Sequence, residues 1–132
     1  MLRARGFTLV ELLVVLAILG LVVALVGPLT ADRLDKARAQ EEWLVLERTV
    51  SGLAFRAFAE GRAVELQAEG SRLTWRVAGA DERALPLKHL FFDPAQQVRI
   101  NANGIAVPAQ LTLQRDGRER RLELNRWLEG RP

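Results

Sequence analysis

The stretch that decides the fold is RGFTLVELLVVLAILGLVVALVGP, which covers residues 5–28. Its central part, residues 12–26, is fifteen residues long and carries no charge. A helix of about 20 residues crosses the hydrocarbon core of a bilayer, because each residue adds about 1.5 Å along the helix axis. A membrane-spanning helix is therefore expected near the N-terminus, and Glu11, the one carboxylate inside the apolar run, needs an explanation.

Two ordinary interpretations of this segment are a cleaved secretory signal peptide and a single-pass anchor. The apolar run is too long for a signal peptide, and no A-x-A cleavage site follows it. An anchor with Arg3 and Arg5 on the cytoplasmic side agrees with the positive-inside rule. The anchor leaves Glu11 unexplained, because a carboxylate in hydrocarbon is costly and usually marks a function.

A third interpretation rests on RGFTLVEL, residues 5–12, and on the short basic segment before it. This stretch resembles the processing site of type IV prepilins and type II secretion pseudopilins. The resemblance implies that prepilin peptidase removes a leader, residues 1–6, by cutting between Gly6 and Phe7, and that Phe7 is then N-methylated. It also implies that Glu11 pairs with the cationic amine of a neighbouring subunit, which would offset the cost of burying a carboxylate.

The same resemblance includes Pro28, since pilins often carry a helix-kinking proline near this point. Residues 7–29 would then form the hydrophobic transmembrane and assembly helix. Gly27-Pro28 is expected to bend that helix or break it locally, because proline lacks an N–H donor and clashes with the preceding turn. If the helix breaks, Thr30 or Asp32 would cap the next one. In a simpler interpretation, Pro28 only marks the membrane exit.

Residues 30–60 have apolar side chains at a helical period, which predicts an amphipathic helix after the hydrophobic one. The part as far as Glu42 is polar on most faces and is expected to be exposed, whereas Trp43 to Phe58 is expected to pack on a sheet. Gly61 is expected to end the helix, because glycine readily adopts the left-handed conformation that closes many helices.

Residues 61–132 show the two-residue alternation of strands, which predicts an antiparallel β-rich head of six or seven short strands. Residues 64–77 are interpreted as a hairpin and residues 78–84 as a loop, and Asp116-Gly117 is a tight-turn signal. The expected fold class is α+β and pilin-like. It combines a long N-terminal helix, half hydrophobic and half amphipathic, with a C-terminal antiparallel β-sheet head.

Two stretches of the head, VRINANGIAV (residues 98–107) and LNRWLEGRP (residues 124–132), resemble the GspH/FimT group of minor subunits. The resemblance implies a structural subunit rather than an enzyme, namely a minor pseudopilin of a type II secretion system. Its implied partners are other pilin or pseudopilin subunits, prepilin peptidase and the inner-membrane assembly platform. The implied location is the inner (cytoplasmic) membrane, crossed once with the head in the periplasm or outside, and then a pseudopilus or pilus filament.

Two alternatives stay open. One is a minor type IV pilin of the FimT kind, in pilus assembly and possible DNA uptake. The other is an unprocessed single-pass membrane protein with a small β-rich binding domain. Arginines near the C-terminus are the candidate DNA contacts, and the competing interpretation is a solvated face with cross-strand ion pairs. The candidate contacts are Arg118, Arg120, Arg121, Arg126 and Arg131.

Composition narrows the chemistry of the chain. It has no cysteine and one histidine, His89, which excludes disulfides and thiol nucleophiles and removes most zinc sites. No metal or cofactor is expected, and His89 is expected to be a partly buried structural residue. The net charge is +3, but without Arg3 and Arg5 17 basic residues face 16 acidic ones. That balance disfavours general nucleic-acid binding and makes DNA an unfavoured partner.

Overall fold

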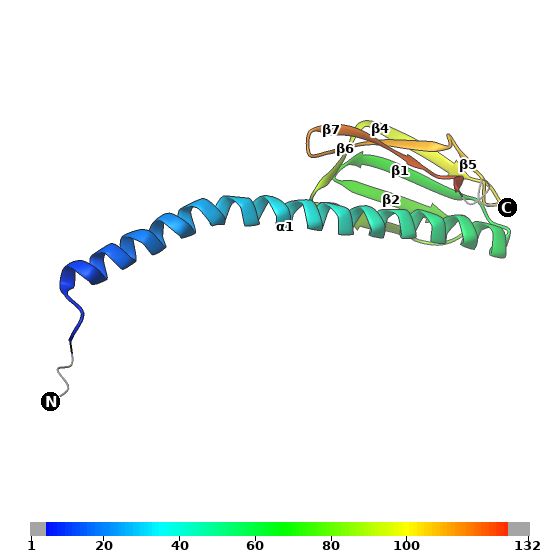
Figure 1. Ribbon diagram of the computed structural model, residues 1–132. Helices are drawn as coiled ribbons and strands as arrows, with labels where there is room; N and C mark the ends of the chain where they lie inside the picture. The colour runs from blue at the N-terminus through cyan, green and yellow to red at the C-terminus, as the bar shows by residue number, and fades with distance from the viewer. Residues whose placement is uncertain (1–4, 127–132) are drawn as a thin grey trace, which may run out of the picture. The chain divides into compact units, whose positions relative to one another are not determined.

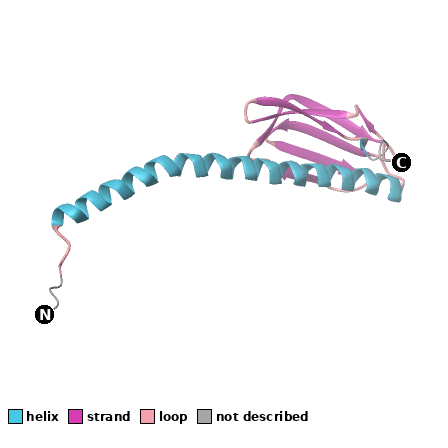
Figure 2. Ribbon diagram, viewed as in Figure 1, coloured by secondary structure: helices cyan, strands magenta, loops and turns pink. Residues whose placement is uncertain are grey.

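One helix, α1 (Leu9–Glu60), accounts for the first half of the chain, and seven strands follow it in the computed structural model (Figure 1). The structure describes residues 5–126. The chain divides into two compact units, residues 1–36 and residues 37–132, and α1 contributes to both. The fold class is α+β and pilin-like, as predicted (Figure 2).

α1 runs through Gly27-Pro28 as one continuous helix. The predicted local break, with Thr30 or Asp32 as the cap of a second helix, is therefore wrong. The Thr30 hydroxyl instead donates to the carbonyl oxygens of Gly27 at 2.8 Å and Val26 at 3.2 Å. A proline removes only one backbone hydrogen bond from the ladder, and the helix continues across that position.

The end of α1 follows the prediction. Gly61 has a φ of +62°, and the N–H of Arg62 donates to the carbonyl oxygen of Ala57 at 3.1 Å. This six-to-one bond across a left-handed glycine is the Schellman arrangement, which satisfies a carbonyl that the helix leaves open.

The seven strands form one antiparallel sheet in the order β3-β2-β1-β4-β6-β7, with β5 paired to β4. The number of strands agrees with the prediction. The strands are β1 (Val64–Gly70), β2 (Arg72–Val77), β3 (Glu82–Pro86), β4 (Leu90–Ile100), β5 (Ala106–Val107), β6 (Gln110–Arg115) and β7 (Arg118–Glu123).

Both expected hairpins are present, and one expected loop is not entirely a loop. β1 pairs with β2, and β6 pairs with β7 across Asp116-Gly117, whose φ angles of +52° and +69° are those of a tight hairpin turn. The loop predicted over residues 78–84 is wrong at its end, because Glu82 already begins the edge strand β3. The first three residues of β3 are all exposed, so this strand lacks the alternation that marks a half-buried strand.

Strand β4 changes partners along its length. Leu90 and Phe91 pair with β6, whereas the later part of β4 pairs with β1. Where β4 and β6 separate, the Gln96 side chain replaces the missing peptide: its amide donates to the Thr112 carbonyl at 2.6 Å and accepts from the Thr112 N–H at 2.7 Å. A side-chain amide therefore closes the gap in the ladder.

The core of the second unit lies between the sheet and the end of α1. Phe58 was expected on the buried face, but 63% of it is exposed. Phe55, on the same helix, is 72% exposed. A helix turns by about 100° per residue, so Phe58 leaves the buried stripe one residue after Ala57. The helix contributes Leu46, Val50, Leu53, Ala54 and Ala57, and the largest fully buried sheet residues are Phe92, Leu73, Leu90, Ile100, Leu111, Leu113 and Val64.

Candidate functional site

The proposed cleavage site lies in the non-helical segment before α1. Phe7 is 91% exposed, and a Cβ built on Gly6 would meet nothing within 4 Å. The described residues therefore give no internal reason for a glycine at position 6. A glycine that the fold does not need fits a position where another protein approaches the backbone closely.

Thr8 and Glu11 form a capping box at the start of α1. The Glu11 N–H donates to the Thr8 hydroxyl at 3.2 Å. In return, Glu11 Oε2 accepts from the Thr8 N–H at 3.1 Å and from the Thr8 hydroxyl at 3.3 Å. Thr8 is thus the N-cap, Leu9 the first helical residue and Glu11 the third, which is the spacing of an S/T-x-x-E box.

The capping box gives Glu11 a local partner that the sequence interpretation missed. The signal was present, since Thr8 and Glu11 are three residues apart before an apolar run. Only Oε2 takes part, so Oε1 has no hydrogen bond to another of the residues 5–126. The carboxylate can therefore cap its own helix and present its second oxygen to a cation from another molecule.

The apolar part of α1 is exposed along its length. Among residues 5–126, one helix is long and apolar enough to cross a membrane, and none of its apolar stretch is buried. Leu12, Leu16 and Leu19 are each more than half exposed. Glu11, whose second carboxylate oxygen is open to a cation, thus lies at the start of a helix whose exposed apolar side chains require lipid or another protein around them.

The described C-terminal arginines gather at the β6–β7 hairpin and just beyond it. Arg118 and Arg120 are exposed and make no ion pair with another described residue, whereas Arg121 pairs with Glu119 at 3.6 Å. Arg126 lies 3.4 Å from Glu47 of α1. The fifth predicted contact, Arg131, lies outside the described residues.

Glu42 is a site residue that the sequence did not reveal. Its Oε1 accepts from the N–H groups of Lys88 at 2.7 Å, His89 at 3.2 Å and Leu90 at 3.4 Å. The partners lie 46 to 48 residues away, so no local pattern could predict the contact. Glu42 ties α1 to the segment before β4, and half-buried His89 takes part through its backbone, which fits a structural role.

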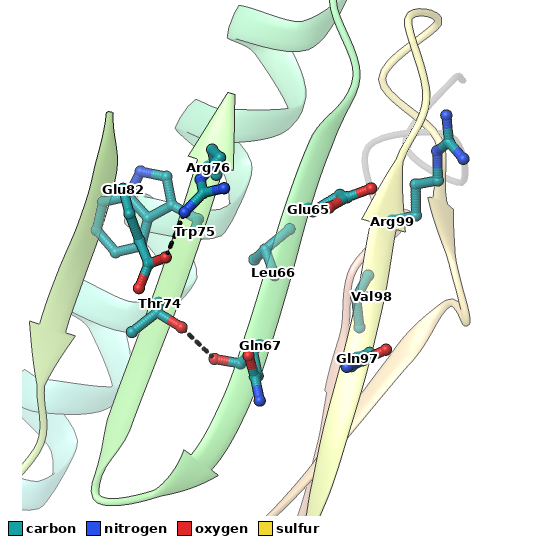
Figure 3. Close-up of a pocket in the computed structure, with 10 residues that line it drawn as sticks. All are labelled: Glu65, Leu66, Gln67, Thr74, Trp75, Arg76, Glu82, Gln97, Val98 and Arg99. Atoms are coloured by element: carbon teal, nitrogen blue, oxygen red, sulfur yellow. Dashed lines mark hydrogen bonds and ion pairs between the residues drawn. The ribbon is translucent and has the colours of Figure 1, made fainter. Parts of the chain in front are cut away.

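The outer face of the sheet is polar (Figure 3). On β1, Glu65 lies in register between Arg76 of β2 and Arg99 of β4. Arg76 also pairs with Glu82 of β3 at 3.0 Å. These residues border an open hollow of about 420 Å³. No group of three histidine, cysteine or acidic residues that could hold a metal occurs within residues 5–126.

Of three comparisons with known proteins, one finds a match, and it lies at the N-terminus. Residues 1–27 match the prokaryotic N-terminal methylation motif, the type IV pilin-type prepilin signal. Comparisons with curated proteins and with solved structures return no match. The motif suggests a type IV pilin or pseudopilin, a structural class that assembles with other pilin subunits and is processed by prepilin peptidase. Residues 1–27 thus carry a prepilin-type methylation signal at the head of a pilin-like α+β chain.

Proposed function

We propose that this chain is a minor pseudopilin, a structural and non-catalytic subunit of a type II secretion pseudopilus. The observation that carries the proposal is the methylation motif on residues 1–27, placed before a helix whose apolar residues are exposed. The resemblance of residues 98–107 to the GspH/FimT group supports a minor subunit. The lack of a cysteine pair supports it too, since many major pilins have one.

The processing step uses the segment before α1. Prepilin peptidase cuts between Gly6 and Phe7 on the cytoplasmic side, and Phe7 is then N-methylated. Before the cut, residues 7–29 cross the inner membrane once with the head on the periplasmic side. After the cut, the assembly platform adds the subunit to the filament.

The assembly step uses Glu11 and, in the same helix, Pro28. Glu11 Oε1, which the capping box leaves open, accepts the cationic amine of a neighbouring subunit. A carboxylate paired with an ammonium group avoids the cost of an isolated charge in hydrocarbon. Pro28, inside the helix, removes one backbone hydrogen bond and softens α1 at that point.

Incubation of the full chain with prepilin peptidase and a methyl donor tests the processing step. The intact mass should fall by the mass of residues 1–6 and rise by one methyl group. Gly6→Val is the matched control, because the space around Gly6 is open and the substitution leaves the chain's own structure unchanged. An unchanged mass for the unsubstituted chain would identify an unprocessed single-pass anchor instead.

Secretion and transformation assays on one deletion strain separate the pseudopilin from a pilin. If the chain is a pseudopilin, the deletion strain should lose secretion and keep DNA uptake. The reverse result would establish the alternative, a minor type IV pilin.

Arg118 and Arg120 are the observation that favours the alternative, because both are exposed and have no acidic partner among residues 5–126. Arginine contacts to phosphates release counterions, so binding should weaken steeply with salt. A gel shift of the full chain in lipid nanodiscs, with duplex DNA at low and high salt, tests this. No shift at low salt would end the DNA-uptake interpretation.

A further inference from the structure

Strand β7 is the last strand of the sheet, and its outer edge is not paired within residues 5–126. β6 covers one side of β7 over the whole length Arg118–Glu123. An unpaired edge presents a row of N–H and C=O groups that can accept another strand. The opposite edge, β3, ends at Pro86, which cannot donate to a further strand.

A groove follows this edge, between β7 and one flank of α1. A hollow of about 230 Å³ is lined by Val50 and Ser51 from the helix and by Leu122 and Leu124 from the end of β7. A second hollow of about 140 Å³ continues it toward Trp43. The two share Glu47, Leu122, Glu123 and Arg126, so they form one open groove.

The groove continues beyond the end of β7 onto exposed aromatic residues. A hollow of about 200 Å³ is lined by Ser51, Ala54, Phe55 and Phe58, and it shares Ser51 with the groove. Phe55 is 72% exposed and Phe58 63%. The two exposed phenylalanines form an apolar patch next to the groove, of the kind that marks a protein interface.

The net positive charge along the β7 edge favours an acidic partner. Residues 118–126 contain four arginines and two glutamates, a net charge of +2. Of the glutamates, Glu119 faces Arg121 and Glu123 accepts a hydrogen bond from Gln110. A second copy of residues 118–126 would bring another net charge of +2 to this edge, and like charges opposite each other in a ladder repel. An acidic strand meets no such repulsion.

We propose that the β7 edge and the adjoining groove, from Trp43 to Phe58 of α1, bind an extended acidic segment of another polypeptide as an added strand. In this mode the main chain of the added segment forms hydrogen bonds with the open edge of β7. Successive side chains of a strand point to opposite faces. On β7, Arg118 and Arg120 share the face of Leu122. The side chains of the added strand that point to this face are therefore apolar over Leu122 and Val50 and acidic beside the two arginines. This interface is independent of how the N-terminus is processed.

The probe is a short threonine-rich peptide with glutamates at alternate positions of one half and valines at the same alternate positions of the other half, added to the full chain in lipid nanodiscs. Hydrogen exchange read by mass spectrometry should show slower exchange across residues 118–123. A peptide N-methylated along one edge of its backbone should bind about tenfold more weakly, since it loses strand hydrogen bonds. A lysine–valine peptide should also bind weakly at low salt.

Variants locate the site. Ser51→Trp fills the groove and should weaken peptide binding about tenfold, whereas Val45→Trp, on another flank of the same helix, should leave it unchanged. Arg118→Glu combined with Arg120→Glu should transfer the preference to the lysine–valine peptide. Both arginines are exposed without an ion pair to a described residue, so the fold does not depend on them.

Three outcomes would overturn the proposal. Equal binding of the N-methylated peptide would show charge attraction without strand addition. Slower exchange with duplex DNA but not with the peptide would make the edge a nucleic-acid surface. Peptide binding only to a chain shortened after Arg126 would show that the edge is taken by the chain's own last residues.

Discussion

At the scale of single residues, Glu11 has two separable roles. It accepts hydrogen bonds from Thr8 within its own chain, and it is proposed to accept an amine from a neighbour. The first role needs an acceptor oxygen, which an amide also supplies, since glutamine serves in capping boxes. The second role needs a negative charge. Substitutions at Thr8 and at Glu11 can therefore test the capping role and the pairing role separately.

Thr8→Val should fray the first turn of α1, because it removes the hydroxyl that caps the Glu11 N–H. Loss of such a cap costs about 1 kcal/mol. Glu11→Gln should keep the turn but lower incorporation into filaments, because it removes the charge. Amide exchange over residues 9–12 and filament incorporation measure the two effects. If Glu11→Gln assembles as well as the unsubstituted chain, charge pairing is excluded.

Glu42 has the clearest structural role of the residues that link α1 to the strands, because one carboxylate serves three backbone N–H groups. Glu42→Ala should lower the free energy of unfolding by about 2–3 kcal/mol, since these donors lose a charged acceptor. Urea unfolding followed by tryptophan fluorescence measures it. Glu41→Gln, at an exposed neighbour, is the matched control and should change stability by less than about 0.5 kcal/mol. Equal effects would contradict the role of Glu42.

At the scale of elements, substitution by alanine should change the free energy of unfolding in opposite directions at a glycine of the helix and at a glycine of the hairpin turn. Gly117 has a φ of +69° in the β6–β7 turn, whereas Gly52 is exposed inside α1, where an added Cβ meets nothing within 4 Å. Gly117→Ala should destabilise by about 1–2 kcal/mol, because an L side chain is strained there. Gly52→Ala should stabilise by about 0.5–1 kcal/mol, because alanine is the better helix former.

Thermal unfolding of the two variants checks both signs. A stabilising Gly117→Ala would mean that the hairpin does not adopt its left-handed turn. A destabilising Gly52→Ala would mean that this face of α1 is covered in the protein.

The elements that the sequence predicted are those set by local patterns. Helical period, strand alternation and the Asp116-Gly117 turn depend on neighbours in the chain, and the structure confirms them. Strand β3 was missed, because an exposed edge strand has no apolar alternation. The Glu42 contact and the Gln96 bridge join distant residues and leave no local signal. The capping box has a local signal, the S/T-x-x-E spacing of Thr8 and Glu11, so the sequence alone is enough to predict it.

At the scale of the whole molecule, the hydrophobic core belongs to the second unit alone. Every member of the core cluster lies between Leu46 and Leu124. The first unit, residues 1–36, has no buried side chain among its described residues. The second unit therefore contains the whole core cluster, and we expect it to fold without the first unit. The apolar part of α1 depends on lipid or on another protein for its burial.

A chain that starts at Ala37 should fold by itself in water. Its free energy of unfolding should agree within about 1 kcal/mol with that of the second unit in the full chain, because no core contact is removed. Urea unfolding by tryptophan fluorescence compares the two, with the full chain in nanodiscs. A shortened chain without a cooperative transition would show that the two units stabilise each other.

The position of the capping box relative to the cut has an electrostatic consequence. The aligned peptide dipoles of a helix place about half a positive charge at its N-terminus. The cut after Gly6 would leave Phe7 as the only residue before the N-cap Thr8. A full ammonium charge would then arise beside the positive end of the dipole, and the two repel. Maturation would thus destabilise the first turn of α1, and a negative charge from Glu11 or from a neighbouring subunit would restore it.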